Sequence, residues 1–175
     1  MKKGLVHIYT GDGKGKTTAC VGLALRMAGS GGKVLYAFMQ KGVMSSEVKL
    51  LETISGIDVF QVCTMTKFSH LQNEEEKAEY RHQHTQGLMK IISLCKSGKY
   101  NMVVVDEAIG AVLEKAIDLE AVMELIQTRP DNCEIILSGR KTPVELTELA
   151  DYVSDIQAVK HPFDKGIPAR RGIEF

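Results

Sequence analysis

The stretch YTGDGKGKTTA, residues 9–19, decides the fold of this 175-residue chain. It follows a short apolar run, LVHIY at residues 5–9, and it opens a segment at 16–28 whose apolar residues recur with helical spacing. Glycines let the backbone turn with positive φ and bring successive N–H groups around an anion, and the start of a helix adds partial positive charge. A strand, a glycine-rich turn and a helix in this order predict a phosphate-binding loop.

The spacing of this loop departs from the usual pattern. That pattern, G-x-x-x-x-G-K-[ST], read back from Gly15, Lys16 and Thr17, requires a glycine at position 10. The chain has Thr10 there, and its first glycine, Gly11, comes one residue late. Phosphate binding is still expected, with Lys16 contacting phosphate oxygens and the Thr17 hydroxyl binding Mg²⁺. The shifted glycine weakens the inference that the loop promotes hydrolysis of a γ-phosphate.

Strands and helices are predicted to alternate along the rest of the chain. Apolar runs and helix-capping signals give strands at 33–39 and 57–62, a helix at 73–96, a strand at 100–107, a helix at 118–129, a strand at 133–139, a helix at 142–150 and a strand at 152–159. Asn73 with Glu76 forms a capping-box signature, and Asp118 is expected to cap its helix. The pattern predicts an α/β fold of the P-loop NTPase (RecA-like) type, a mostly parallel sheet with helices on both faces, as a single domain over residues 1–175.

Three polar clusters follow predicted strands at the point where each strand ends. They are the phosphate loop, Asp106 with Glu107, and the sequence SGR at 138–140. Because parallel strands end at one edge of a sheet, we expect these clusters to form one ligand site. Either acid can give Mg²⁺ the hard oxygen ligand it prefers, and Arg140 suits a phosphate. Arg26, on the helix after the loop, is either a nucleotide contact or a solvated surface residue.

Composition excludes several classes of protein. Lys plus Arg equals Asp plus Glu at 22 each, so no basic field predicts nucleic acid as a partner. No apolar run approaches the roughly 20 residues that span a bilayer, and the N-terminal stretch is too short for a signal peptide. The four cysteines, at positions 20, 63, 95 and 133, lack metal-ligand spacing and are expected to be reduced, buried thiols. We therefore expect a cytoplasmic protein without a membrane partner.

Two histidines in the sequence RHQH, at 81–84, have the look of a metal motif. Positions two apart on a helix point to different faces, so we expect His82 and His84 to lie on a solvated surface.

Residues 160–175, KHPFDKGIPARRGIEF, combine an aromatic residue, glycines and charges. This content predicts an ordered segment packed near the site in place of a frayed terminus.

The phosphate loop, the sequence VVVDE at 103–107, SGR at 138–140 and KHPFDKGIPARRGIE at 160–174 together resemble the ATP:corrinoid adenosyltransferases that act on cob(I)alamin or cob(I)yrinic acid a,c-diamide. The resemblance covers nearly the whole chain, in order. It implies that the cobalt(I) of a corrinoid attacks the 5′ carbon of ATP and that the whole triphosphate leaves, in cobalamin biosynthesis or salvage. The loop would then hold a leaving group, with Mg²⁺ and Lys16 stabilising its charge.

The resemblance also implies which residues form the site. It gives catalytic roles to Lys16, Thr17 and Glu107, with Mg²⁺ on Thr17 and Glu107 and with Asp106 close behind. Arg26 matches a family arginine, which favours a nucleotide contact. The remaining residues expected to bind nucleotide or corrinoid are Gly11, Asp12, Gly13, Lys14, Gly15, Thr18, Arg140 and His161.

On the corrinoid side, members of the family often carry a G-F-T-W stretch. The corresponding sequence here is KFSH at 67–70, which keeps Phe68 and has His70 where tryptophan is usual. In the family, that aromatic pair displaces the lower axial ligand of cobalt and eases its reduction. The His70 imidazole either ligates cobalt or fills space. The resemblance further implies a homodimer and an electron donor such as a flavoprotein reductant.

Two other functions fit the same fold. One is an ATP-dependent kinase or RecA-like ATPase, and the other is a non-catalytic nucleotide- or corrinoid-binding protein. Formation of ADP favours the first, and formation of triphosphate favours the transferase. The presence of Lys16, Thr17 and both acids speaks against the second, because a carrier has little need of magnesium.

Overall fold

The structure, a computed structural model, describes residues 3–39, 46–63 and 73–174. Within these ranges, six strands form one sheet in the order β3-β2-β4-β5-β1-β6, and all neighbouring strands are parallel. The strands are β1 (Val6–Thr10), β2 (Val34–Phe38), β3 (Ile57–Gln61), β4 (Met102–Asp106), β5 (Glu134–Ser138) and β6 (Tyr152–Asp155). The helices are α1 (Lys16–Gly29), α2 (Ser46–Leu51), α3 (Glu74–Lys96), α4 (Ala108–Leu113), α5 (Leu119–Gln127), α6 (Val144–Leu149) and the 3₁₀ helix η2 (Pro162–Lys165).

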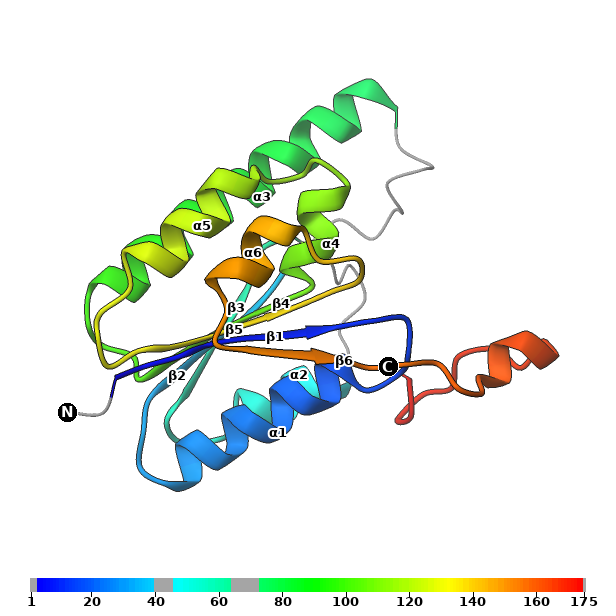
Figure 1. Cartoon of the computed structure of the whole chain (residues 1–175), viewed down its shortest axis with the longest axis horizontal. Helices are drawn as coiled ribbons and strands as arrows, with labels where there is room; N and C mark the ends of the chain where they lie inside the picture. Colours follow the sequence, from blue (N-terminus) through cyan, green and yellow to red (C-terminus); the bar gives the residue numbers. More distant parts are fainter. Residues whose placement is uncertain (1–2, 40–45, 64–72, 175) are drawn as a thin grey trace.

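Helices cover both faces of the sheet (Figure 1). Helices α1 and α2 lie on one face, and α3, α5 and α6 lie on the other. Side chains alternate along the strands, so that Val104 packs in the cluster under α1 whereas Val103 packs in the cluster under α3. Strand β4, buried at all five positions, lies inside the sheet between β2 and β5. The predicted α/β fold, with a parallel sheet and helices on both faces, is confirmed.

Two short helices, α2 and α4, were not predicted. Each has six residues, which is too few for the spacing of apolar residues to show a helical period. Helix α4 also lacks a capping signal, because its N-cap position holds Glu107 in a left-handed conformation without a side-chain cap. The capping box of Asn73 and Glu76 is confirmed, with both hydrogen bonds at 2.8 Å. The expected cap at Asp118 is wrong: the residue holds the N-cap position, but α5 is held by its buried apolar face and the carboxylate caps no N–H.

Strand β6 is shorter than predicted, and its early end shapes the site. Its last residue, Asp155, pairs with Thr10 of β1. The next residue, Ile156, donates its N–H to the Thr10 carbonyl at 2.9 Å and accepts the N–H of Gly13 at 2.7 Å. The chain after β6 therefore pairs with the phosphate loop where the sheet ends.

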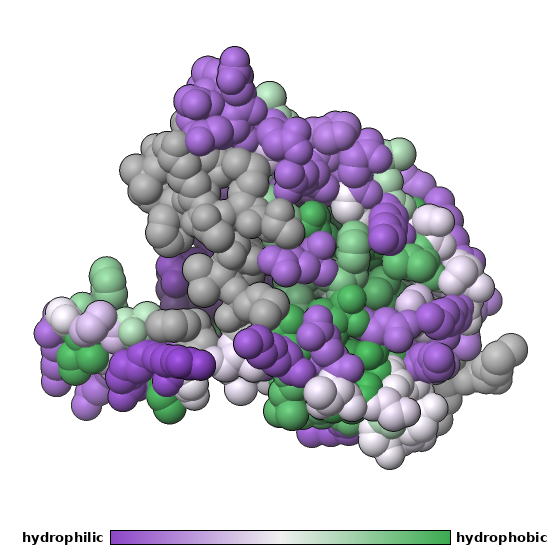
Figure 2. Space-filling view, turned by 180° about the vertical axis from the view of Figure 1, so that it is seen from behind, coloured by the Kyte–Doolittle hydropathy of each residue, from purple (hydrophilic) through white to green (hydrophobic). Residues whose placement is uncertain are grey.

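The tail divides into two parts. The 3₁₀ helix η2 stands out from the body of the molecule (Figures 1 and 2), and its Phe163 is 75% exposed. Residues 172–174 return to the phosphate loop, where they line its cavities. The prediction of a segment packed near the site holds for this second part.

All four cysteines are free and buried, as predicted. In the part of the chain described, no helix is long and apolar enough to cross a bilayer.

His84 corrects a prediction. His82 is exposed as expected, whereas His84 is fully buried, with Nδ1 2.7 Å from the Tyr80 carbonyl oxygen and Nε2 2.6 Å from that of Met39. It belongs to the buried stripe of α3, which continues at positions 87, 88, 91, 92 and 95. That spacing was visible in the sequence, and it outweighs the polar character of the residue.

The stability of the protein should fall as the pH falls below about 6.5, the ordinary pKa of a histidine side chain. Burial lowers the pKa of His84, and its two carbonyl contacts offset this only in part. The folded state then binds fewer protons than the unfolded state, so acid favours unfolding. Urea denaturation at pH 7.5 and pH 5 should show this loss in the wild type and in His82→Gln. If His84→Gln loses as much unfolding free energy between pH 7.5 and pH 5 as the wild type, another group is responsible.

Candidate active site

The phosphate loop joins β1 to α1 and is shaped by close packing against the chain after β6. A Cβ on Gly13 would lie 2.6 Å from the Ile156 carbonyl oxygen, and one on Gly11 would overlap Asp155 and Ile156. Gly11 and Gly15 also have positive φ, at 97° and 121°. Thr10 remains in β1 because it pairs with Asp155, so the loop starts one residue later than the usual pattern requires.

Lys16, the first residue of α1, is folded back over this loop. Its Nζ donates to the carbonyl oxygens of Gly11 at 2.6 Å and Gly13 at 2.8 Å, and the residue is only 7% exposed. Burial lowers the pKa of Lys16, the charge of Arg140 lowers it further, and nearby acids including Glu107 raise it. The loop thus holds a cation beside backbone N–H groups at a helix start, an arrangement that binds phosphate.

Asp106, at the end of β4, is held by two hydroxyl groups. The Thr17 hydroxyl donates to Oδ2 at 3.0 Å, and the Ser138 hydroxyl donates to Oδ1 at 2.6 Å. Ser138 also accepts the N–H of Glu107 at 2.8 Å. Both Asp106 and Ser138 are buried. One carboxylate therefore connects α1, β4 and β5 at the edge of the sheet that the sequence predicted.

Glu107 has a left-handed backbone, with φ at 61°, which is uncommon for a residue other than glycine. The Ser138 hydrogen bond and the following helix α4 hold it there. The side chain lines both cavities beside the loop. Backbone strain at such a position is typical of functional sites, and Glu107 brings a second carboxylate to the cavities that Thr17 also lines.

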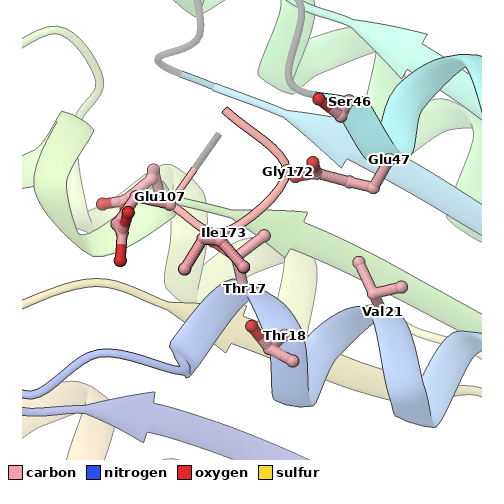
Figure 3. A pocket seen from close by; sticks show the side chains of 9 residues that line it. Thr17, Thr18, Val21, Ser46, Glu47, Glu107, Gly172 and Ile173 are labelled. Carbon is pink, nitrogen blue, oxygen red and sulfur yellow. The ribbon is translucent and has the colours of Figure 1, made fainter. Parts of the chain in front are cut away.

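Two cavities, of about 470 and 250 Å³, adjoin the loop. Both are lined by Thr17, Thr18 and Glu107 and by the tail residues Ile173 and Glu174. Figure 3 shows the larger one between the start of α1, helix α2, Glu107 and the returning tail. Carboxylates line both cavities, and the smaller one also has the cations Lys14, Lys16 and Arg140 in its lining.

The structure gathers most of the predicted site residues here. The smaller cavity is lined by Asp12, Lys14, Gly15 and Lys16 of the loop, together with Arg140 and His161. Arg140 pairs with Asp12 at 3.8 Å, and both side chains are exposed. Arg26 lies exposed in the last turn of α1, outside the lining of both cavities, and its nucleotide contact stays a prediction. Phe68 and His70 lie outside the described residues.

Sequence reasoning missed three contributors to the site. Ser138 was noted only as part of SGR. Its position at the end of a predicted strand, like that of Asp106, was the signal that could have placed its hydroxyl beside the acid. Glu47, which lines the larger cavity, stands on the unpredicted helix α2. Glu174, which contacts Lys14 at 3.1 Å, is brought to the loop from a point 160 residues along the chain.

These features define a class of protein: an α/β protein of the P-loop NTPase type, with a glycine-rich loop, a buried lysine and paired acids at one edge of its sheet. The family model described as ATP:corrinoid adenosyltransferase BtuR/CobO/CobP matches residues 2–175. The chain therefore belongs to this family, and the resemblance drawn from its motifs is confirmed.

Similar proteins span nearly the same length. The chain is 32% identical to the corrinoid adenosyltransferase of Escherichia coli (strain K12), with 99% of this chain and 87% of the relative covered. It is also 32% identical to corrinoid adenosyltransferase CobA of Salmonella typhimurium, over the same shares. The corresponding protein of Pseudomonas aeruginosa is 28% identical, over 99% of this chain and 85% of its own length.

Replacing Ser138 by alanine should destabilise the protein by about 1–3 kcal/mol. Buried Asp106 loses the Ser138 hydroxyl as a donor, and the Glu107 N–H loses the Ser138 oxygen as an acceptor. Chemical denaturation measures the loss, with Ser154→Ala, at an exposed serine of β6, as the matched control. Equal stability of the Ser138→Ala protein and the wild type would show that these hydrogen bonds do not hold the site.

Proposed function

We propose that this chain transfers the 5′-deoxyadenosyl group of ATP to the cobalt(I) of a corrinoid, either cobalamin or cob(I)yrinic acid a,c-diamide, and releases triphosphate. The observation that carries the proposal is the family match over residues 2–175. The site supports this proposal, because it offers cations for a triphosphate. The reaction needs no general base, since cobalt(I) is itself the nucleophile. Cobalt(I) supplies the electron pair of the new cobalt–carbon bond, and the electrons of the broken C5′–O bond leave on the triphosphate.

In this reaction the chain's own residues hold and neutralise the leaving group. Backbone N–H groups of the loop and of the start of α1 donate to phosphate oxygens, and Lys16 transfers its hydrogen bonds from the loop carbonyls to those oxygens. Lys14 and Arg140, which line the same cavity, add positive charge. Charge develops on the triphosphate as the C5′–O bond breaks, so these contacts strengthen in the transition state.

We further propose Mg²⁺ as the cofactor. The Thr17 hydroxyl and the carboxylates of Asp106 and Glu107 are hard oxygen donors, the type that Mg²⁺ prefers. Mg²⁺ usually takes one or two carboxylates together with substrate phosphates and water, so this small donor set fits. When bound, the ion would offset the negative charge of the triphosphate.

A homodimer and an electron donor such as a flavoprotein reductant are proposed from the family alone. A single domain over residues 1–175 and a cytoplasmic location are proposed from the length and composition of the chain. On the corrinoid side, Phe68 and His70 are proposed to face the lower side of cobalt. His161, in the lining of the smaller cavity, is proposed as a further substrate contact.

Product analysis tests the function. Anaerobic incubation with chemically reduced cobalamin, ATP and Mg²⁺ should yield one triphosphate for each adenosylcorrinoid, because the bond broken is C5′–O. Absorbance follows the cobalt–carbon bond, and anion chromatography measures the triphosphate. Corrinoid-dependent formation of ADP and phosphate would instead identify an ATPase or kinase on the same fold.

A further inference from the structure

The segment Arg170–Glu174 places a carboxylate on the phosphate loop. Oε1 of Glu174 accepts from Lys14 Nζ and from Arg170 Nη2, each at 3.1 Å. Oε2 accepts from the Arg170 backbone N–H at 2.7 Å and from its Nε at 3.3 Å. One carboxylate thus receives four hydrogen bonds from an ammonium, a guanidinium and a backbone amide.

This carboxylate is an anion at all ordinary pH values. Hydrogen bonds from the side chain and backbone of Arg170, and from Lys14, lower the pKa of Glu174 to about 2. Glu174 lines both cavities together with Thr17, Thr18 and Glu107. Figure 3 shows the returning segment, at Gly172 and Ile173, passing above the start of α1 in the lining of the larger cavity. A negative charge therefore lies beside the phosphate loop, in the lining of both cavities.

The donors around Glu174 are those that bind phosphate oxygens. Guanidinium and ammonium groups with a backbone amide form charge-assisted hydrogen bonds to carboxylate and phosphate alike. Glu174 is also close to other negative groups of the cavity, among them Glu107. A triphosphate with several negative charges would compete for Lys14 and Arg170 and would repel Glu174.

We propose that Arg170 is a further triphosphate-binding residue and that Glu174 occupies its anion site until nucleotide displaces it. The proposal rests on the proposed function in one respect, that the ligand is a triphosphate. On binding, phosphate oxygens replace the carboxylate on Lys14 and Arg170. Glu174 then sets the affinity by competition, while Arg170 contributes to binding.

The two residues of this ion pair should affect binding in opposite directions. Titration calorimetry of the full chain with inorganic tripolyphosphate, and with ATP, should show about threefold to tenfold tighter binding by Glu174→Gln. Arg170→Ala should bind about threefold to tenfold more weakly. The gain in Glu174→Gln should shrink as salt is raised, because it comes from removed repulsion between charges.

A pair that only orders the tail gives a different result, since losing either partner then changes affinity in the same direction. If Glu174→Gln and Arg170→Ala change the affinity in the same direction, the proposal is overturned. Unchanged affinity in both variants would also overturn it. Glu148→Gln on α6 and Arg81→Ala on α3, both exposed, control for the loss of one charge.

Failure of this inference can be told from failure of the proposed function. A wild-type protein that binds tripolyphosphate and forms adenosylcorrinoid, with variants that do not move in opposite directions, overturns only the role of Arg170 and Glu174. A wild-type protein that forms ADP and phosphate in place of adenosylcorrinoid overturns the proposed function, whichever way the two variants move.

Discussion

The hydrogen bonds from Lys16 to the carbonyls of Gly11 and Gly13 are the interaction on which the site depends. They fold the long cationic side chain of Lys16 back across the glycines of the loop, so the ammonium group lies inside the turn. The position costs free energy, since burial lowers the pKa of the ammonium. Neighbouring carboxylates, among them Glu107, offset that cost and keep the cation in place.

The sheet supplies the rigid support for this arrangement. Strand β6 pairs with β1 as far as Thr10, and Ile156 then pairs with Gly13, so the backbone of the loop continues the sheet. On the other side, Asp106 joins Thr17 of α1 to Ser138 of β5. The backbone of the loop is therefore fixed at both ends, which suits the proposed role of holding a charged leaving group.

Much of this arrangement could be predicted because its sequence signals are local. A strand, a glycine turn and a helix stand in order at residues 5–28, and the capping box at Asn73 lies within four residues. Parallel strands bring their ends to one edge, which is why Asp106 and Arg140 could be placed near the loop from sequence alone. The family followed from motifs that span the chain.

The rest depends on contacts between distant residues. Glu174 reaches Lys14 across 160 positions, and no pattern in either segment shows that pairing. Helices α2 and α4 are too short to show a period, and Asp118 has the right residue type without making the cap. His84 was misjudged for another reason: its polar identity was given more weight than the buried stripe to which it belongs.

The most direct test of the account is the turnover number of Lys16→Ala at saturating ATP, with preformed cobalt(I) so that reduction is not limiting. Because Lys16 is proposed to lie where charge develops on the triphosphate, turnover should fall about a hundredfold or more. Lys77→Ala, at a partly exposed lysine of α3 outside the lining of both cavities, should stay near wild type. An unchanged turnover number with only a raised KM for ATP would contradict the account, since Lys16 would then bind substrate and transition state equally.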